Sequence, residues 1–384
     1  MNKKEINLLF IVFHGIDKAG GGIGKKINSQ VGAFQNLGIK TSLSFLEVND
    51  DNQYIGRKVN GETIEQFKKN FGKYIQWKWR YKFKKLIRYI ENQKINVVYI
   101  RYSHFANPYF IYFLKRLKKK EIRILMEIPS YPYDIEYNKV GISLKIVKRI
   151  EEFYRRYFYK YVDRMVTFST FSKIFGVDTI KINNGVNINS IPLKNNIKKD
   201  TNIHLIAVAV MNVWHGYDRL IEGLRLYYDN NPETKVYFHV VGDGEDNESM
   251  NYKSLVKKYR LNDYVLFYGF KTGEDLNKLF DYADFAVGSI GIHRIGLTHT
   301  NPIKFSEYTA RGIPFLYSGI YDIFENQPFI YKVTNDDSPV DIVQLLSFIQ
   351  KIEFTPGEIR KFAERHLTWE IQMNKVIEEV LLLQ

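Results

Sequence analysis

Residues Gly288 to Pro314 read GSIGIHRIGLTHTNPIKFSEYTARGIP, and this segment indicates the architecture of the chain most clearly. It follows a short apolar run, opens as a long polar loop, continues as a helical pattern and ends in Gly-Ile-Pro before another apolar run. A buried strand, a loop, a helix and a second strand form the repeating unit of a parallel α/β sheet. Ligands bind beyond the carboxyl ends of such strands, so binding residues are expected in the loop and in the first helical turn.

The same alternation of short apolar runs and helical patterns extends over both halves of the chain. In the second half, strands are expected over Ile203–Val208, Lys235–Val241, Val265–Phe267, Phe285–Val287 and Phe315–Tyr317, and helices over Tyr217–Tyr228, Tyr252–Tyr259, Glu274–Tyr282 and Ile303–Arg311. In the first half, strands are expected over Leu8–Phe13, Thr41–Leu46, Asn96–Ile100, Ile122–Glu127 and Met165–Phe168, and helices over Lys26–Leu37, Ile64–Gln93, Pro108–Lys119 and Leu144–Val162. The predicted fold class is therefore α/β, with two doubly wound, Rossmann-like domains.

The length of 384 residues also favours two domains, because single cores rarely grow beyond about 250–300 residues. The alternating pattern breaks into a polar stretch rich in Asn and Lys between Ile182 and Asn202. We expect an N-terminal domain over residues 1–187, a second domain over residues 188–365, and a C-terminal helix over residues 366–384 that packs back on the first domain. Two sheets facing each other would place the ligand site in a shared cleft.

Composition narrows the class of protein. The chain is 45% hydrophobic and 26% charged, which is typical of a globular protein. The absence of cysteine excludes disulfides, thiolate zinc sites and a cysteine nucleophile, and it agrees with a reducing cytoplasm. A formal net charge of +14 favours contact with phosphates, anionic lipid headgroups or nucleic acid without choosing among them. No nucleic-acid recognition module is evident, so we expect no nucleic acid partner.

Glycine-rich turns follow three of the expected strands. Ala19 to Lys25 reads AGGGIGK before a helix, where the backbone N–H groups of Gly22 and Gly24 can approach an anion. The spacing matches neither a dinucleotide fingerprint nor a P-loop, and a plain flexible loop is the alternative. The second turn contains Gly242 and Gly244, and the third ends at Gly269-Phe270, where a planar base would fit against the backbone. Ordinary tight turns are the alternative for both.

Lys304 and Glu307 lie three residues apart, so they share one face of the first turn of the expected helix. A carboxylate at this place can accept both hydroxyls of a ribose. The lysine ammonium and the helix N-terminus can face a diphosphate. An ordinary surface ion pair is the alternative.

Taken in order, these motifs resemble those of retaining glycosyltransferases of family 4 in the GT-B fold, of the bacterial capsule, exopolysaccharide and O-antigen type. The matching pieces are the Gly-Gly-x-Gly loop with Gln30 and Leu37-Gly38, then Asn184-Gly185-Val186, Trp214–Asp218, Val241–Gly244, Gly269-Phe270 and Lys304–Pro314. The resemblance implies transfer of a sugar from a UDP- or GDP-linked donor to a glycan or lipid-linked acceptor, in surface polysaccharide biosynthesis. We expect no metal, because no acidic pair of the DxD kind follows a strand as a cation site would, and no cofactor beyond the donor co-substrate.

The resemblance also implies roles for individual residues. Glu307 matches the second acid of the family's E-x7-E pair, which holds the ribose, and His299 stands where the first acid contacts the donor sugar. Lys304 and Arg294 are expected on the phosphates, so the catalytic candidates are His299, Lys304, Glu307 and Arg294. The remaining residues expected to bind the nucleotide sugar are Gly22, Gly24, Gly242, Gly244 and Phe270.

Two departures from the family pattern put its activity in question. His299 replaces an acid that touches the donor sugar, which leaves the donor identity open. The family often clamps the diphosphate with an Arg and a Lys, and this chain has Val210 and His215 near those positions. Two alternatives therefore stay open: a non-catalytic glycan-binding or partner subunit on the same fold, and a nucleotide-sugar epimerase or hydrolase.

The acceptor side is expected on the N-terminal domain, where Arg101, His104, Glu127 and Tyr131 follow strands; loop packing is the alternative for these residues. The stretch Phe67 to Leu86 mixes cations and aromatic residues at helical spacing, as a helix resting on an anionic membrane does. A core helix with a solvated basic face explains it equally well. We expect a cytoplasmic protein that contacts the inner face of the membrane peripherally.

Overall fold

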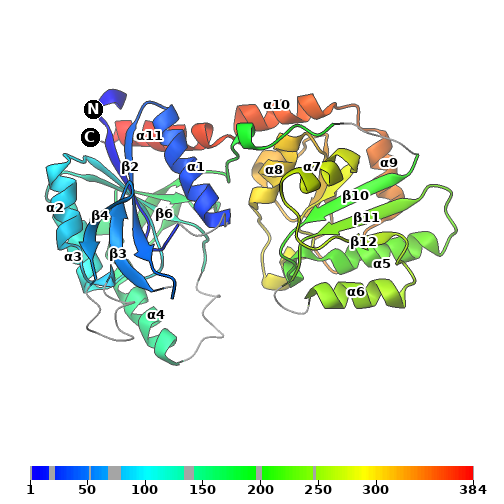
Figure 1. Cartoon of the computed structure of the whole chain (residues 1–384), viewed down its shortest axis with the longest axis horizontal. Coiled ribbons are helices and arrows are strands. Elements are labelled where there is room, and N and C mark those ends of the chain that lie inside the picture. Colours follow the sequence, from blue (N-terminus) through cyan, green and yellow to red (C-terminus); the bar gives the residue numbers. More distant parts are fainter. Residues whose placement is uncertain are drawn as a thin grey trace. The chain divides into compact units, whose positions relative to one another are not determined.

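The structure is a computed structural model that describes residues 2–16, 22–51, 53–67, 79–133, 142–195, 201–244 and 248–383, the side chains of 142–144 excepted. The chain divides into two compact units (Figure 1). The N-terminal unit contains Met1–Asn183 together with Trp369–Gln384, and the C-terminal unit contains Asn184–Thr368. These limits lie close to the ones expected at residues 187 and 365, and the end of the chain returns to the first unit.

The N-terminal unit is built around a mixed sheet. Within the described residues, its nine strands follow the order β4-β3-β2-β1-β5-β6-β7-β9-β8. The neighbours from β2 to β9 pair in parallel, whereas β3, β4 and β8 pair antiparallel at the two edges. The strands are β1 Asn7–Ile11, β2 Lys40–Val48, β3 Tyr54–Val59, β4 Glu62–Gln66, β5 Val97–Arg101, β6 Arg123–Ile128, β7 Arg164–Thr167, β8 Lys173–Ile174 and β9 Val177–Lys181.

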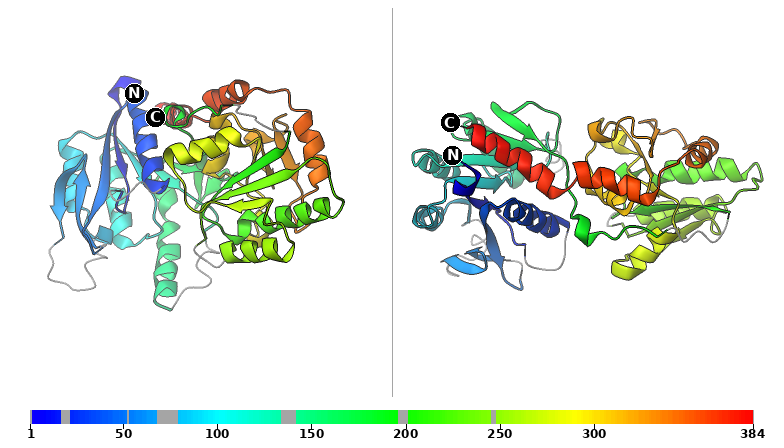
Figure 2. Two further views of the ribbon diagram at one scale, coloured as in Figure 1. Left: turned by 45° about the vertical axis from the view of Figure 1, so that its right-hand side comes forward. Right: turned by 90° about the horizontal axis from the view of Figure 1, so that it is seen from above.

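Helices cover both faces of this sheet, which explains why its central strands read as continuous apolar runs. In β1, Leu9 and Ile11 belong to the core on one face, whereas Leu8 and Phe10 belong to the core on the other. The first core includes residues of α2 and α3, and the second includes residues of α1 and α11, which pack against each other (Figure 2). The helices are α1 Gly22–Asn36, α2 Lys84–Asn92, α3 Pro108–Lys118, α4 Ile142–Arg155 and α11 Trp369–Leu382.

The C-terminal unit contains an all-parallel sheet, with the order β12-β11-β10-β13-β14-β15 in the described residues. In chain order this is 3-2-1-4-5-6, the doubly wound Rossmann arrangement, so the predicted fold class is confirmed. Its strands are β10 Ile203–Val208, β11 Val236–Val241, β12 Val265–Phe267, β13 Phe285–Val287, β14 Phe315–Ser318 and β15 Ile330–Val333. Its helices are α5 Tyr217–Tyr228, α6 Glu248–Lys258, α7 Gly273–Tyr282, α8 Ile303–Arg311, α9 Ile342–Gln350 and α10 Pro356–His366.

The expected helix over Ile64–Gln93 is wrong. Ile64 lies on β4, which forms an antiparallel pair with β3, and α2 begins only at Lys84. The side chains of Arg57 and Glu65 explain the strand, because these oppositely charged residues stand directly across from each other and are both buried. Residues 68–78, the centre of the basic and aromatic stretch, lie outside the described part of the chain.

Substitution of Ile377 tests whether α11 is an integral part of the N-terminal unit. Ile377 is fully buried in the core shared with α1, so Ile377→Ala is expected to lower the free energy of unfolding by about 2–5 kcal/mol. Leu382→Ala on the same helix is the matched control, because the Leu382 side chain is 70% exposed. Urea unfolding followed by circular dichroism measures both variants. Equal, small effects would mean that α11 does not contribute to this core.

Candidate functional site

The strand order of the C-terminal unit reverses between β10 and β13, and a crevice forms where such a reversal occurs. The loops that follow these two strands contact each other through their backbones: the N–H of Gly291 donates to Trp214 O at 3.1 Å, and the N–H of Ile290 donates to His215 O at 3.0 Å. Gly216 has a φ of +66°, and a Cβ there would lie 2.7 Å from the nitrogen of Gly291. Only glycine permits this approach, which brings both loops to one edge of the sheet.

Lys304 lies in the first turn of α8, directly after the β13 loop. Its side chain is partly exposed, but its ammonium nitrogen is buried and has no hydrogen-bond partner. Burial lowers the pKa of Lys304 to about 7, an effect that the nearby Glu307 carboxylate opposes. A buried ammonium group without a partner, at a helix N-terminus beyond the strand ends, provides what an anionic ligand requires.

Glu307 is exposed one turn further along α8. The helix that carries it is held from the other side, since the Ser306 hydroxyl donates to Asn184 O at 2.6 Å and the Tyr308 hydroxyl donates to Val287 O at 3.2 Å. Asn184 also bonds to the backbone and side chain of Asn301, in the loop before α8. The Asn184-Gly185 motif thus positions the segment that presents Lys304 and Glu307.

The two positions near the family's phosphate clamp carry no cation. Val210 is 54% exposed and apolar. His215 is buried, and its Nδ1 accepts a hydrogen bond from the N–H of Asn212 at 3.0 Å. Burial and then the charge of Lys304 lower the pKa of His215 to about 2, so the imidazole is neutral near neutral pH. At this edge of the sheet, Lys304 is therefore a cation positioned to meet an anion.

Arg294 is engaged elsewhere, contrary to its expected place on the phosphates. Its guanidinium donates to both carboxylate oxygens of Asp218, at 2.8 and 2.6 Å, and to Asp337 at 2.7 Å. The hydrogen bonds that it donates to these two carboxylates raise its pKa. Two carboxylates neutralise its charge, and the contacts tie the β13 loop to α5 and to the loop after β15. We therefore remove Arg294 from the proposed phosphate contacts.

His299 lies exposed in the loop before α8. Its Nδ1 is 3.0 Å from the hydroxyl oxygen of Thr298, and its backbone pairs with that of Ile320. Exposed apolar side chains also lie in this loop, at Leu297, and in the loop after β10, at Val213 and Trp214. An exposed histidine with one local side-chain partner can donate a further hydrogen bond to a sugar hydroxyl or accept one from it.

The glycines after β11 serve packing, whereas Phe270 is open to a ligand. Gly242 has a φ of +111°, and a Cβ there would lie 1.9 Å from Ala209 O, so glycine is required by the neighbouring loop. A Cβ at Gly244 would lie 3.1 Å from the nitrogen of Ser249, a tighter contact than usual. The Phe270 side chain is 77% exposed beyond β12. An exposed aromatic ring at a strand end is suited to stacking on a planar base.

In the N-terminal unit, Gly22 and Gly24 lie in the first turn of α1, whose helix begins four residues before the expected Lys26. A Cβ at Gly22 would meet no atom within 4 Å, whereas one at Gly24 would lie 3.2 Å from Ile16 O. Packing therefore does not require glycine at position 22. The N–H groups of a first helical turn lack partners within the helix, so this turn can bind an anion. Residues 17–21 of the loop lie outside the described residues.

Two acceptor-side candidates belong to a buried charge network at the carboxyl ends of β5 and β6. Glu127 is fully buried, pairs with Arg101, and accepts hydrogen bonds from Tyr99 Oη at 2.6 Å and Gln30 Nε2 at 2.7 Å. Burial alone raises the pKa of Glu127, but Arg101, Lys26 and these hydrogen bonds together hold it below its usual value. Arg101 and Glu127 thus satisfy each other inside the unit.

Lys26 was not predicted as part of this network. Burial lowers its pKa to about 7, an effect that Glu127 opposes. Its Nζ lies 3.5 Å from the centre of the Phe168 ring. The signal in the sequence is that Lys26 and Gln30 stand four residues apart on the apolar face of α1, where a polar pair needs a buried partner.

The other two acceptor-side candidates lie nearer the surface. His104 adopts a φ of +50°, and its ring stacks on Tyr133 with centroids 3.6 Å apart. Tyr131 packs edge-on against Phe171 at 4.9 Å. Both side chains are half-buried at the carboxyl edge of the sheet, so they remain accessible to an acceptor.

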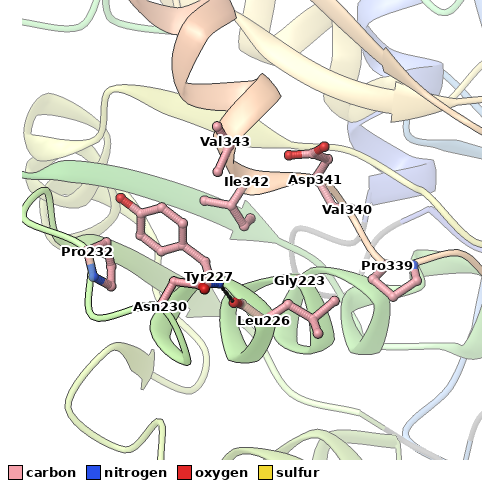
Figure 3. A pocket seen from close by; sticks show the side chains of 10 residues that line it. All are labelled: Gly223, Leu226, Tyr227, Asn230, Pro232, Pro339, Val340, Asp341, Ile342 and Val343. Carbon is pink, nitrogen blue, oxygen red and sulfur yellow. Dashed lines mark hydrogen bonds between the residues drawn. The ribbon is translucent and has the colours of Figure 1, made fainter.

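A pocket of about 590 Å³ lies elsewhere in the C-terminal unit (Figure 3). It is lined by the second half of α5, the loop that leads into β11 and the start of α9, through residues that include Tyr227, Asn230 and Asp341. None of its lining residues is a predicted site residue. We therefore do not assign the donor to this pocket.

Comparison with known proteins agrees with this geometry. Residues 189–343 match the family described as glycosyl transferases group 1. The match lies within the C-terminal unit and covers most of it. The predicted enzyme class, a glycosyltransferase, is thereby confirmed, with the candidate residues His299, Lys304 and Glu307 inside the matched range. A search of curated protein sequences finds no match.

Solved structures similar to the whole chain share its GT-B fold at low sequence identity. A glycosyltransferase from Rickettsia africae has a TM-score of 0.63 at 15% identity, with 99% of each chain covered. Sucrose-phosphate synthase from Thermosynechococcus elongatus has a TM-score of 0.62 at 15% identity, with 99% of this chain and 100% of that one covered. Anabaena HepE in complex with UDP has a TM-score of 0.61 at 12% identity, with coverage of 98% and 100%.

The buried ammonium of Lys304 predicts a pH-dependent stability. The pKa of Lys304 is about 7 in the folded protein, whereas an unfolded lysine titrates near pH 10.4. Between these values the unfolded chain binds more protons, so stability rises with pH. Lys304→Met is expected to be more stable than the wild type near pH 7 and to lose this part of the rise.

Urea unfolding across this pH range measures the effect, with Lys278→Met on the exposed surface of α7 as the control. The control is expected to follow the wild-type profile. A Lys304→Met variant that is less stable than the wild type near pH 7 would contradict the buried, partnerless ammonium.

Proposed function

We propose that the enzyme transfers a sugar from a nucleoside-diphosphate donor to a glycan or lipid-linked acceptor with retention of configuration, in surface polysaccharide biosynthesis. The observation that carries the proposal is the buried, partnerless ammonium of Lys304, next to exposed Glu307 at the switch point of the C-terminal sheet. A diphosphate supplies the missing partner, and a ribose supplies hydroxyl groups for the carboxylate. The UDP bound in Anabaena HepE supports UDP as the first nucleotide to test.

The proposed chemistry is electrostatic. Charge develops on the diphosphate as the sugar leaves, and preorganised donors in a dry site stabilise such charge most effectively. Lys304 and the N-terminus of α8 supply these donors, Glu307 holds the ribose, and Phe270 stacks on the base. His299 contacts the donor sugar. In a front-face transfer the leaving phosphate takes the acceptor proton, so no side-chain base is required.

The acceptor binds to the N-terminal unit in this proposal. His104 and Tyr131 are the accessible groups at the carboxyl edge of its sheet, while the network of Arg101 and Glu127 keeps that edge rigid. Gly22 and Gly24, in the first turn of α1, offer backbone N–H groups to an anionic group of a substrate. No helix in the described part of the chain is long and apolar enough to cross a bilayer. We place the enzyme in the cytoplasm, at the inner face of the membrane, where a lipid-linked acceptor is reached by peripheral contact.

A non-catalytic subunit on the same fold is the second candidate. Its support is specific: Val210 and His215 provide no charge near the phosphate clamp, and Arg294 is neutralised by Asp218 and Asp337. Such a subunit would bind glycan or an active transferase and would show no affinity for nucleotide sugars.

Calorimetry and thermal unfolding against UDP, GDP, their sugar conjugates and unrelated nucleotides separate the two candidates, because a specific ligand stabilises only the folded state. Selective binding of one sugar nucleotide supports the transferase. No binding across the panel supports the non-catalytic subunit. Release of an altered free sugar without any acceptor would instead indicate an epimerase or hydrolase, and the anomeric configuration of a transfer product tests retention.

Removal of the Glu307 carboxylate is expected to weaken donor binding. Glu307→Ala loses hydrogen bonds to a charged group, which corresponds to about 1.5–3 kcal/mol, or roughly 10- to 150-fold in Kd. Glu274→Ala, an exposed acid on α7, is the matched control and is expected to leave Kd unchanged. Calorimetric titration with the donor found in the panel measures both. Unchanged affinity in Glu307→Ala would remove this residue from the site.

Donor binding is also expected to depend on pH. A bound diphosphate favours the charged lysine, so binding adds a proton to Lys304 when the pH is above about 7. Affinity then falls as the pH rises beyond this value, by up to about tenfold per pH unit. Titrations in buffers of different ionisation enthalpy detect the proton uptake directly. Lys304→Met binds more weakly and shows no such uptake; uptake that persists in this variant would assign the proton to another group.

A further inference from the structure

Helix α4 of the N-terminal unit is fixed in orientation by a buried acid. Glu151 is 2% exposed and accepts hydrogen bonds from Tyr102 Oη at 2.6 Å and Tyr133 Oη at 2.8 Å. Arg155, one turn later, donates to the same carboxylate at 3.1 Å. Phe158, just beyond the helix, is fully buried in the core. These contacts determine which face of α4 points away from the unit.

The face that points away is apolar. Ile146, Ile150 and Phe153 are 55%, 44% and 45% exposed. They stand at positions i, i+4 and i+7, so they form one continuous stripe along the helix. Figures 1 and 2 show α4 running to the rim of the N-terminal unit. Contiguous apolar surface of this kind on a soluble protein marks an interaction site.

Cations border this stripe. Lys145 and Arg149 are exposed on α4, where each directly precedes a residue of the stripe, and Arg156 and Lys160 are exposed just beyond the end of the helix at Arg155. Arg156 lies 4.7 Å from the centre of the Phe153 ring. Between residues 145 and 160 the sequence contains six cations and two acids.

The two acids pair with two of these six cations, Glu151 with Arg155 and Glu152 with Lys148, so the net charge of this segment stays positive. Glu151 is buried, and Glu152 pairs with Lys148 at 3.6 Å. The exposed face of α4 is therefore apolar in the centre and positive at its edge. Arginine stacked on an aromatic ring adds to this arrangement, because its apolar plane and its charge are presented together.

We propose that this face of α4, with the stripe Ile146, Ile150 and Phe153, docks on an anionic lipid bilayer. The apolar side chains enter the boundary between headgroups and acyl chains, while the cations beside them contact lipid phosphates. The proposal rests on the membrane contact proposed above and assigns it to α4 rather than to the stretch Phe67–Leu86. Charge complementarity selects a bilayer as the occupant, because a row of cations along an apolar stripe matches an anionic lipid surface and opposes a second copy of the same positive face.

Vesicle sedimentation of the full chain tests the proposal. The wild type is expected to sediment with vesicles of phosphatidylcholine mixed with phosphatidylglycerol, to remain in solution with phosphatidylcholine alone, and to release as salt rises. The double variant Ile150→Glu, Phe153→Glu is expected to lose at least about tenfold in partition, because charge is excluded from the acyl boundary. Leu382→Glu is the matched control on α11, with a similarly exposed apolar side chain, and is expected to bind like the wild type.

A fluorescent variant tests the same contact if the double variant folds poorly. In Phe153→Trp, the new indole is expected to shift its emission to the blue with the anionic vesicles alone. No binding of the wild type to anionic vesicles, or binding retained in the double variant, would overturn the proposal. A wild-type dimer in light scattering that the double variant converts to a monomer would overturn it in favour of a second copy.

The donor site provides a separate readout. Donor affinity and melting temperature are measured on the same variants, and both are expected to match the wild type. Vesicle binding without any affinity for nucleotide sugars would contradict the transferase and leave the α4 surface intact. Nucleotide-sugar binding without vesicle binding would contradict the α4 surface and leave the transferase intact.

Discussion

The close approach of two backbone loops at Gly216 and Gly291 is the constraint on which the candidate donor site depends. A Cβ at Gly216 would collide with the β13 loop, so the loops after β10 and β13 meet only because this position is glycine. Their contact places His215 close enough to Lys304 for the lysine charge to lower the pKa of the histidine. It also fixes the direction in which the chain enters α8. The chemistry of the site is therefore a consequence of backbone geometry before any side chain is considered.

Charged side chains near the candidate sites are paired to different degrees in the two units. In the N-terminal unit, Glu127 is surrounded by Arg101, Lys26 and two hydrogen-bond donors, so its negative charge is compensated inside the fold. In the C-terminal unit, Arg294 is compensated by two aspartates, but the ammonium of Lys304 is left without a hydrogen bond. Uncompensated buried charge is destabilising, and proteins retain it where a ligand supplies the partner. Glu127 therefore stabilises the fold, whereas the ammonium of Lys304 can still pair with an anionic ligand.

The N-terminal unit carries a second surface of functional interest, the apolar stripe on α4. A positively charged chain attracts anions in general, but attraction alone does not orient an enzyme. The apolar stripe on α4 is positioned by the buried Glu151, so orientation follows from the same kind of internal pairing that holds Glu127. An enzyme whose acceptor is anchored in lipid gains from such a fixed attachment, because the reacting partners are then confined to one surface.

Local sequence determined the elements whose signals are local: the central buried strands of both sheets, the helices α5 to α8, and the turn at Lys304 and Glu307. It failed at the β3–β4 hairpin, because Arg57 and Glu65 are paired by a contact across strands that no spacing along one segment reveals. It also did not reveal that Arg294 is paired, since the two aspartates that neutralise it come from α5 and from the loop after β15, 76 and 43 residues away in the chain. Sequence alone thus specified which groups are available and which segments are helix or strand. Only the tertiary structure decided which charges are paired and which ammonium is left for a ligand, because burial and pairing depend on neighbours that the fold brings together.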